Sequence, residues 1–555
     1  MTLLTDTYQS IVDKAVKAIH RRDFYAAYPE HPKAYGEEAP KRGQEEFQSL
    51  LNKNFDLLLQ NKPEGFIGEE VSPYTMEPLG IRYPRFAVED LIQRSTQAWS
   101  TWRKANPDER MNVLVDSLER IKERFFTIAY ATMHTTGQSF IMSFQASGPH
   151  SNDRALEAIA MGYEELKRFP DEVLWEKPMG KDSSVKVQKF FRAVPKGIGL
   201  VIGCSTFPVW NTVPGLYATL ITGNTAIVKP HPKSVLPIAI VIAELQQALQ
   251  AAGFDPHVVQ MAVDSSEKLI TKQLAEHPAV KLIDYTGSST FGNYIESLVT
   301  HGKTVFTEKA GVNSVILHAS ENLDATLQNL AFAVSLYSGQ MCTAPQNFFI
   351  PASGVKSGDK MISYEEVIEK LKQYVQGLAL NPKAGPGTLG AIQSEATMHR
   401  IEHSVSLGKV ILPPGDVKNP EFEKARVKSP VILEASASDR AIYGKELFGP
   451  IIVVIKTKDV EESIALAKQM GAEQGAITCA AYTTDEQLGK KIMEEMESVF
   501  VPVTLNFHGF IWVNQHAAFS DFHVTGGNPA GNASFTNPEY VIKRFVWVGH
   551  RKLIA

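Results

Sequence analysis

The fold is decided by residues 197–229, which read GIGLVIGCSTFPVWNTVPGLYATLITGNTAIVK. Two short apolar runs stand at the ends of this stretch, with a longer apolar segment between them. The pattern predicts a buried strand over 197–204, a helix over 210–220 and a second strand over 226–229. A strand, a helix and a strand in this order form one βαβ unit of a parallel sheet.

The same alternation continues downstream. The pattern predicts helices over 235–252 and 265–276, and strands over 258–263 and 282–285. Repeated βαβ units predict an α/β fold for this region, and in such folds ligands bind at the carboxyl ends of the strands. A nucleotide site is therefore expected at that edge of the sheet.

Upstream of this region the chain is mainly helical. Apolar residues recur at helical spacing over 88–104, 109–124 and 153–167, and the polar, turn-rich stretch 31–40 is expected to be a loop. Residues 184–194 instead alternate in a way that suits an exposed strand or arm.

Composition excludes several classes of protein. The 555 residues are 44% hydrophobic and 21% charged, which is typical of a globular protein. The net charge of −5 gives no excess of basic residues of the kind that nucleic-acid binding requires. No export signal and no apolar run of about 20 residues is visible, so no membrane contact is expected. The three cysteines are far apart and the fifteen histidines lack ligand spacing, which favours a reducing cytoplasm and no metal site.

Two strand ends carry candidate ligand groups. Lys229 and Lys233 follow the strand over 226–229, where an adenosine ribose or phosphate can be held; the alternative is a solvated polar turn. Gly287, Ser288 and Gly292 lie in a turn that follows a strand and opens a helix, where backbone amides can bind a pyrophosphate. Their spacing is not that of the standard GxGxxG dinucleotide motif, so an ordinary turn is the alternative.

A candidate nucleophile stands in Ser338-Gly339-Gln340-Met341-Cys342-Thr343-Ala344-Pro345. Glu308 precedes Cys342 by 34 positions (342 − 308). A thiol framed by a turn-forming Ser-Gly and a Pro can be delivered to a cleft, and a carboxylate within reach can activate a water to release what the sulfur has captured. The alternative is that Cys342 is a small core residue. Cys204 and Cys479 are interpreted as core cysteines in strands.

Several blocks of the sequence together resemble the aldehyde dehydrogenase superfamily, from about residue 72 to the C-terminus. The blocks match in order and spacing; they are residues 197–234, 286–292, 308–311, 339–343 and Glu446-Leu447-Phe448-Gly449-Pro450. Within the superfamily, four features are most similar to the PaaN-type proteins of bacterial phenylacetate degradation. These are residues 204–211 (CSTFPVWN), residues 340–345 (QMCTAP) and the ending 523–529 (HVTGGNP), together with the long N-terminal extension.

The resemblance implies a mechanism. Cys342 is expected to attack the aldehyde carbonyl and form a thiohemiacetal, then a thioester, and Glu308 to activate the hydrolytic water. The family places an Asn in the oxyanion site, where this chain has Thr206, so a closer carbonyl, an intervening water or another donor such as Asn211 is implied. Lys309 replaces a neutral residue beside Glu308, and we expect it to pair with that carboxylate or lower its pKa.

The resemblance also implies NADP or NAD as cofactor. Glu446 and Phe448 match the pair that holds the nicotinamide ribose and packs near the ring, and Gly287, Ser288 and Gly292 match the pyrophosphate turn. NAD-preferring relatives carry an acid three positions after the strand-ending lysine, where this chain has Pro232. With the acid gone, Lys229 and Lys233 can both face a 2′-phosphate, so NADP is expected to serve at least as well as NAD.

By the same mapping, the chain has a Rossmann-type dinucleotide-binding domain with N-terminal helices (1–172 and 194–312), an α/β catalytic domain (313–514) and a β oligomerisation arm (173–193 and 535–555). The arm implies a homodimer or homotetramer. The expected reaction is NAD(P)-dependent oxidation of an aldehyde, and the expected substrate is a CoA-linked semialdehyde from aromatic catabolism. A generic enzyme, a CoA-acylating enzyme and a catalytically weakened binding protein are the alternatives; a fused hydratase domain is not expected.

Overall fold

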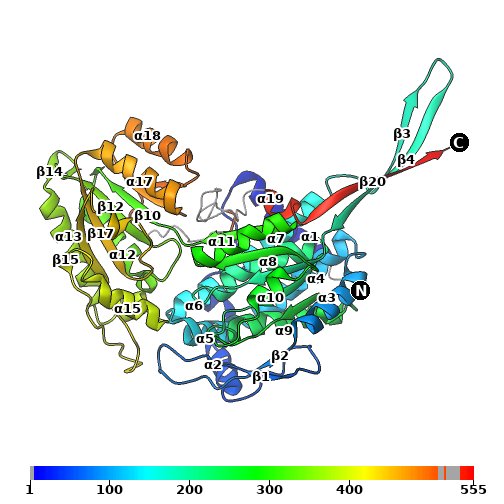
Figure 1. Cartoon of the computed structure of the whole chain (residues 1–555), viewed down its shortest axis with the longest axis horizontal. Coiled ribbons are helices and arrows are strands. Elements are labelled where there is room, and N and C mark those ends of the chain that lie inside the picture. The colour runs from blue at the N-terminus through cyan, green and yellow to red at the C-terminus, as the bar shows by residue number, and fades with distance from the viewer. Residues whose placement is uncertain (1–4, 510–517, 520–537, 555) are drawn as a thin grey trace.

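The computed structural model describes residues 5–509, 518–519 and 538–554. Figure 1 shows two lobes side by side and a ribbon of strands that projects from one of them and carries the C-terminus. The two lobes hold separate sheets, and an active-site cavity lies between them. Among the described residues, no helix is both long and apolar enough to cross a membrane.

The first lobe is built on a five-stranded parallel sheet in the order β7-β6-β5-β8-β9. Its strands are β5 (Ile198–Ile202), β6 (Thr225–Lys229), β7 (Val259–Met261), β8 (Val280–Gly287) and β9 (Thr304–Lys309). The helices between them are α8 (Pro208–Ile221), α9 (Leu236–Ala251), α10 (Thr271–Glu276) and α11 (Ser289–Ser297), with the short 3-10 turns Pro256–Val258 and Leu298–His301.

Side chains on β5 alternate between two apolar layers. Leu200 and Ile202 pack on the layer formed with α3 (Val88–Trp102), α10 and α11, whereas Val201 packs with α8 and α9. Successive residues of a strand point to opposite faces, and here both faces are covered by helices, so the strand is apolar throughout. The sequence prediction of a parallel α/β sheet is confirmed.

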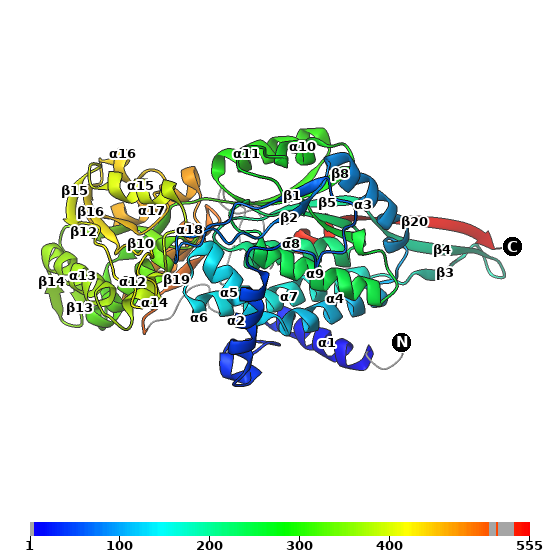
Figure 2. The ribbon, with the colours of Figure 1, turned by 90° about the horizontal axis from the view of Figure 1, so that it is seen from below.

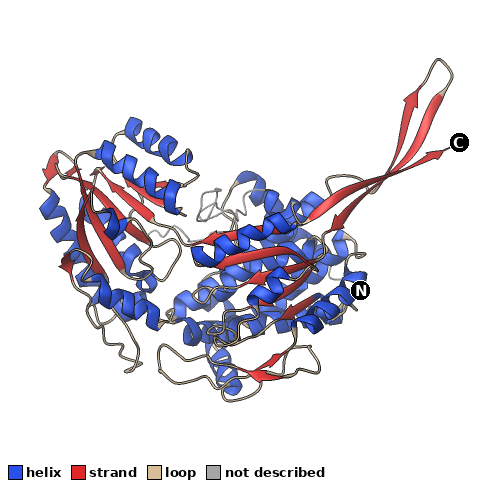
Figure 3. Cartoon of the chain, viewed as in Figure 1, coloured by secondary structure: helices blue, strands red, loops and turns tan. Residues whose placement is uncertain are grey.

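The N-terminal region wraps the first lobe with helices, as Figures 2 and 3 show. α7 packs along α8, and α1 lies against α7 and α4. The bounds are α1 (Thr5–Arg21), the 3-10 turn Pro32–Tyr35, α2 (Ala39–Leu50), β1 (Gly65–Ile67), β2 (Tyr83–Arg85), α4 (Pro107–Lys122), α5 (Phe125–Thr136), α6 (Phe140–Ser147) and α7 (Pro149–Leu166).

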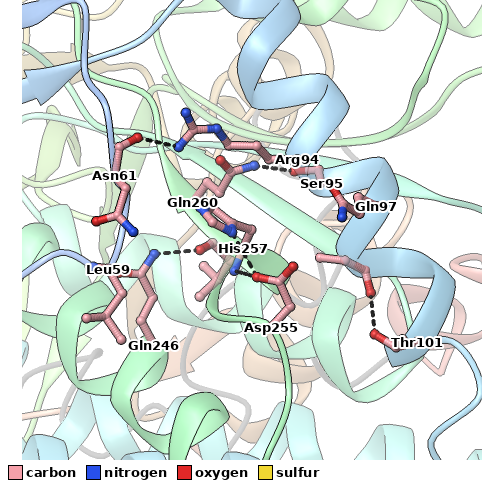
Figure 4. A network of polar contacts seen from close by, with 12 residues as sticks. Leu59, Asn61, Arg94, Ser95, Gln97, Thr101, Gln246, Asp255, His257 and Gln260 are labelled. Atoms are coloured by element: carbon pink, nitrogen blue, oxygen red, sulfur yellow. Dashed lines mark hydrogen bonds and ion pairs between the residues drawn. The ribbon is translucent and has the colours of Figure 1, made fainter.

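Polar side chains fasten the chain before β1 to the first sheet (Figure 4). The Gln246 carbonyl oxygen accepts a hydrogen bond from the amide of Leu59 at 2.7 Å, and Gln246 donates to the carbonyl of Val259 at 2.8 Å. Gln260 donates to Ser95 of α3 at 2.7 Å. These side-chain hydrogen bonds hold in place the irregular segment before β1, which is not itself a strand.

The second lobe contains a seven-stranded sheet in the order β15-β16-β17-β12-β10-β18-β19, parallel except for β15. Its strands are β10 (Asn313–Leu317), β12 (Pro345–Pro351), β15 (Lys409–Leu412), β16 (Val431–Ser436), β17 (Ile451–Thr457), β18 (Cys479–Tyr482) and β19 (Val503–Leu505). A small sheet joins β11 (Ala319–Ser320), β13 (Val355–Ser357) and β14 (Lys360–Ile362). The helices are α12 (Leu323–Ser335), the 3-10 turn η4 (Leu336–Gly339), α13 (Tyr364–Ala379), α14 (Gly385–Leu389), α15 (Glu395–Ser404), α16 (Arg440–Tyr443), α17 (Val460–Gln474) and α18 (Glu486–Glu497).

The projecting ribbon is a three-stranded antiparallel sheet in the order β20-β4-β3. It is formed by β3 (Glu172–Pro178), β4 (Ser184–Pro195) and β20 (Phe545–Ile554), and β20 follows the short helix α19 (Glu539–Ile542). The prediction of an exposed strand over 184–194 is confirmed. Apolar side chains that include Leu174, Trp175 and Leu553 remain exposed on it.

Two local predictions are wrong. Residues 265–276 form a helix only from Thr271, because the Asp264 carboxylate accepts from the amide of Ile270 at 3.0 Å and thereby fixes a turn instead. The expected loop over 31–40 contains a 3-10 turn at Pro32–Tyr35 and the start of α2. Residues 523–529, used for the resemblance, lie outside the described residues.

Candidate active site

A cavity of about 850 Å³ lies between the two lobes, at the carboxyl ends of the five parallel strands. The candidate site residues that line it are Cys342, Glu308, Thr206, Lys229, Gly287, Ser288, Glu446 and Phe448. This volume falls in the upper part of the range found for cofactor and ligand sites. The structure therefore brings together residues that lie as much as 242 positions apart in the chain (448 − 206). Lys233 and Gly292 do not line the cavity.

Cys342 lies on a loop between η4 and β12 that is held in an uncommon backbone conformation. Tyr337 and Ser338 have φ values of 50° and 49°, in the left-handed region that side chains other than glycine rarely adopt. Hydrogen bonds compensate for this strain, since the Tyr337 hydroxyl donates to the carbonyl of Thr136 at 2.6 Å and the Ser338 hydroxyl to that of Leu389 at 2.9 Å. The loop is thus held from both lobes.

Asn313 fixes the thiol-bearing turn. Its side-chain amide donates to the carbonyl oxygens of Cys342 at 2.7 Å and Ala344 at 3.0 Å. Its carbonyl oxygen accepts from the amides of Ile477 at 2.9 Å and Thr478 at 3.1 Å. One buried side chain therefore ties the nucleophile loop to the start of β18. The sequence prediction missed Asn313; its place two residues after Gly311 was the only available signal.

A close backbone approach joins the nucleophile loop to the Glu446–Gly449 turn. A side chain at Gly339, whose φ is 61°, would come within 2.4 Å of the Gly449 carbonyl oxygen. Glycine is required there by both conformation and space. The same turn is held by Arg400, which donates to the carbonyl of Phe448 at 2.7 Å. Glu446 and Phe448 are thereby carried to the cavity next to the thiol loop.

The Cys342 thiol donates a hydrogen bond to the Glu308 carboxylate. Burial raises the pKa of Cys342 well above its ordinary value, and the adjacent Glu308 charge raises it further. The thiol is therefore protonated at neutral pH, and it is hydrogen-bonded to the carboxylate that the sequence prediction paired with it. Glu308 can remove the proton when the sulfur attacks.

A buried arginine that the sequence prediction missed acts on the same pair. Arg154, on α7, is nine-tenths or more buried, and its guanidinium lies 3.4 Å from the centre of the Trp210 ring. Its charge interacts with Glu308 and lowers the pKa of Cys342, opposing part of the rise caused by burial. In the sequence, Arg154 is one polar residue of an amphipathic helix, and this pattern does not indicate a role beside the thiol.

The turn between β5 and α8 differs from its prediction. Cys204 lies outside the strand and lines the cavity, so its interpretation as a core residue of a strand is wrong. Its sulfur accepts from the backbone amides of Thr206 and Phe207, and from the Asn211 side chain at 3.4 Å. Thr206 lines the same cavity, and the Asn211 carbonyl oxygen has no hydrogen-bond partner among the described residues. Cys479 is buried at the start of β18, as expected.

Lys309 does not pair with Glu308, which corrects the prediction. Neighbouring residues of β9 point to opposite faces, and the Lys309 ammonium lies 2.9 Å from the carboxylate of Glu296 on α11 and 3.0 Å from Asn293. A side chain at Gly292 would collide with the Lys309 side chain at 2.5 Å. Gly292 therefore makes room for this lysine, while Gly287 and Ser288 face the cavity.

The cavity fits a dinucleotide. Glu446 is a half-buried carboxylate at the cavity wall; loss of hydration raises its pKa to about 7, and Arg400 offsets part of that shift. Such a carboxylate gains from ribose hydroxyl donors. A side chain at Gly287 would meet the Tyr285 hydroxyl at 2.5 Å, so the turn that precedes α11 requires glycine at this position.

A second cavity of about 320 Å³ shares Phe207 with the first. Its walls are mainly apolar and include Met142, Trp210, Leu336 and Met341, the neighbour of Cys342. One polar feature is a hydrogen bond between the His150 ring nitrogen and the Glu30 carboxylate, 3.0 Å apart. The sequence prediction did not identify this cavity, because its lining residues look like core in one dimension.

Comparison with known proteins identifies the family. The model of the aldehyde dehydrogenase family matches residues 68–545. An NAD-dependent aldehyde dehydrogenase from Burkholderia multivorans has a crystal structure that is 41% identical in sequence, covers all of both chains and superposes with a TM-score of 0.97. The alpha-ketoglutaric semialdehyde dehydrogenase of Bacillus subtilis is 25% identical over 69% of this chain and 75% of its own.

More distant relatives share the fold. A 1-pyrroline-5-carboxylate dehydrogenase of Halalkalibacterium halodurans is 26% identical over 68% of this chain and 70% of its own. A 1-pyrroline-5-carboxylate dehydrogenase structure from Thermus with bound NAD is 18% identical, covers 96% of this chain and 99% of its own, and has a TM-score of 0.75. From the extent of these matches, the chain belongs to the aldehyde dehydrogenase family and is an NAD- or NADP-dependent oxidoreductase that acts on small-molecule aldehydes.

Proposed function

We propose that this chain oxidises its aldehyde to a carboxylic acid through a covalent thioester on Cys342. The observation that carries the proposal is that the Cys342 thiol and the Glu308 carboxylate are hydrogen-bonded to each other in the cavity that also presents Gly287, Ser288 and Glu446. Nucleophile, base and cofactor groups thus share one solvent-accessible volume.

In the first step the sulfur of Cys342 attacks the aldehyde carbon while its proton passes to Glu308. A carbon–sulfur bond forms and the carbonyl oxygen becomes an oxyanion. The backbone amide of Cys342, Thr206 and Asn211 are the candidate donors to this oxygen, and Asn313 holds the turn that aims the first of them. When NAD(P) is bound, its nicotinamide accepts the hydride from the same carbon.

In the second step water hydrolyses the thioester. Glu308 first releases to solvent the proton that it took from the thiol. It then takes a proton from the water while the water oxygen bonds to the acyl carbon and the carbon–sulfur bond breaks, and the Cys342 thiolate leaves and regains a proton from Glu308. The products are the acid, the reduced cofactor and a proton. The Glu308 carboxylate beside the Cys342 sulfur favours water over CoA as the acyl acceptor. Because the nucleophile and the base are both present, an active enzyme is favoured over a catalytically weakened binding protein.

We propose that the substrate's acyl group occupies the second cavity. Phe207, Trp210 and Met341 favour an apolar chain next to the carbonyl, and the Glu30–His150 pair favours a polar group further along. Glu30 comes from the N-terminal segment, which precedes the family match at residue 68. An aldehyde with a polar distal end, such as a CoA-linked semialdehyde of phenylacetate breakdown, fits this division, and the resemblance to PaaN-type proteins supports it.

We also propose the organisation of the whole molecule. Residues 1–172 and 194–312 form the cofactor domain, 313–514 the catalytic domain, and 173–193 with 535–555 an oligomerisation arm; the separate sheets support this division, and residues 510–514 and 535–537 lie outside the described part. The exposed strand edge of the arm favours a homodimer or homotetramer. Three free cysteines suit a cytoplasmic setting.

The test is formation of reduced cofactor with a panel of aldehydes: a simple aliphatic aldehyde, glutamate semialdehyde and a CoA-linked semialdehyde. We expect the CoA-linked compound to give the highest kcat/KM and Cys342→Ala to be inactive with all three. Equal kcat/KM values across the panel would refute the substrate proposal. Turnover by Cys342→Ala would refute the mechanism.

A further inference from the structure

A buried ion pair lies at the end of the cofactor cavity that is farthest from the catalytic pair. Glu308 is on β9 and the pyrophosphate turn follows β8, whereas Lys229 ends β6, two strands further along the sheet order β7-β6-β5-β8-β9. A dinucleotide that reaches Cys342 with its nicotinamide therefore places its adenosine beside Lys229. At this end the Lys229 ammonium is 2.5 Å from the carboxylate of Asp264, and their side chains are only 3% and 1% exposed.

Asp264 reaches Lys229 because β6 and β7 are parallel neighbours. Val228 and Met261 are paired in register, so the residues that follow both strands emerge at the same edge of the sheet. The Asp264 carboxylate is held there by the amide of Ile270 at 3.0 Å. Lys229 also donates to the carbonyl of Pro230 at 2.8 Å. One of its N–H donors is thus hydrogen-bonded to the backbone, and its charge is paired with that of Asp264.

Other ionisable groups lie around this pair. One is Lys272, which lines the cavity and whose ammonium lies 4.8 Å from the centre of the Tyr294 ring on α11. Burial lowers the pKa of His231 to about 4, so its ring is neutral at neutral pH. Lys233 is exposed and does not line the cavity. A second carboxylate, Glu69, accepts from the amide of Ser266 at 3.1 Å and interacts with Lys229 and Asp264. Lys229, Asp264 and Glu69 together carry a net charge of −1.

The sequence alone favoured NADP, because Pro232 replaces the acid that in NAD-preferring relatives follows the strand-ending lysine. The structure supplies an acid from the neighbouring strand instead. A 2′-phosphate carries a charge of about −1.5 to −2 at neutral pH and needs an uncompensated cation. Lys229 is already compensated, but its ammonium can still donate to a neutral ribose hydroxyl.

We infer that Asp264 is a specificity-determining residue that acts through Lys229: by neutralising the lysine, it makes the adenosine site select the 2′-hydroxyl of NAD over the 2′-phosphate of NADP. The inference rests on the dinucleotide site proposed above and is independent of the aldehyde. It can therefore be tested with cofactor fragments, and a failure here leaves the Cys342 mechanism untouched.

The experiment is titration calorimetry of the full-length protein with 5′-AMP and with 2′,5′-ADP, which differ only at the 2′ position. We expect the wild type to bind 5′-AMP at least about tenfold more tightly, and Asp264→Asn to reduce this preference at least about tenfold by leaving the Lys229 charge uncompensated. Asp264→Glu keeps the charge and should keep the preference. In the double variant Asp264→Asn with Lys229→Met, the gain in 2′,5′-ADP affinity should disappear.

Asp255→Asn is the matched control. It removes an equal charge at the opposite end of β7, where Asp255 contacts His257 in the network of Figure 4, and should leave both affinities unchanged. Binding of 5′-AMP shows that each variant is folded; if Asp264→Asn fails this check, Glu69→Gln replaces it, with a smaller change in the same direction. Equal affinity of the wild type for both fragments, or an unchanged ratio in the folded variant, would overturn the inference.

Discussion

Removal of the Asn313 side chain should show how much turnover depends on the placement of the Cys342 loop, because the Cys342 thiol itself is kept. Asn313→Ala deletes two donated and two accepted hydrogen bonds, with donor–acceptor distances of 2.7 to 3.1 Å, between the Cys342 turn and β18. At roughly 1 kcal/mol of net stability for each bond, the loss is about 4 kcal/mol, less any part that water restores. A misplacement of the sulfur by about 1 Å lowers turnover on the order of 100-fold.

The assay compares kcat with stability to denaturant for Asn313→Ala and for Asn224→Ala. Asn224 is an equally buried clamp in the first lobe, where it accepts from the amide of Gly197 at 2.8 Å and donates to the carbonyl of Arg544 at 3.1 Å. We expect both variants to lose similar stability, but only Asn313→Ala to lose kcat on the order of 100-fold. Equal kcat in the two variants would refute the assignment of Asn313 to the nucleophile loop.

Three further predictions concern the pKa values and the second thiol of the cavity. Arg154 lowers the pKa of Cys342, so Arg154→Gln should move the pH midpoint of Cys342 alkylation upward and Arg154→Lys should largely restore it; an unmoved midpoint contradicts this role. Burial raises the pKa of Glu446 to about 7. If its carboxylate accepts ribose hydroxyls, as expected from the family resemblance, cofactor affinity should rise with pH to a plateau above about 7 and Glu446→Gln should flatten that profile; a pH-independent wild type contradicts it. Cys204 is not the nucleophile, so Cys204→Ala should retain aldehyde turnover within about tenfold, and a total loss would show that the sulfur is required.

The parallel sheet could be predicted because its strands and helices differ in period and length. Apolar runs such as those of β5 and β6 are buried on both faces, and the helices between them are long enough to show their own spacing. The helix expected from residue 265 begins later because side chains, instead of helical carbonyls, accept hydrogen bonds from the backbone amides. The Ser265 hydroxyl accepts from the amide of Lys268 at 3.2 Å, and Asp264 accepts from that of Ile270. Such local competition is not visible in hydrophobic spacing.

The candidate site could be predicted only in part. Cys342 and Glu308 could be proposed as a pair because each stands in a short motif with a chemical reason; the structure brings the two side chains together, and their catalytic roles stay predictions. Arg154 and Asp264 were missed because their partners are distant in sequence, and only the folded chain places a cation of α7 beside Glu308 or an acid of the β7 edge beside Lys229. Lys309 was wrongly paired with Glu308 because neighbouring residues of a strand point to opposite faces of the sheet.

The most direct test of the mechanism is to locate the acyl intermediate by peptide mass spectrometry. The wild type is mixed with aldehyde and oxidised cofactor and quenched in acid during the first turnover, before the thioester is fully hydrolysed. The mechanism predicts an acyl mass added to the peptide that contains Cys342, at least one equivalent of reduced cofactor per modified chain, and no adduct in the variant Cys342→Ala. Reduced cofactor formed without an adduct, or an adduct on Cys204 instead, would contradict it.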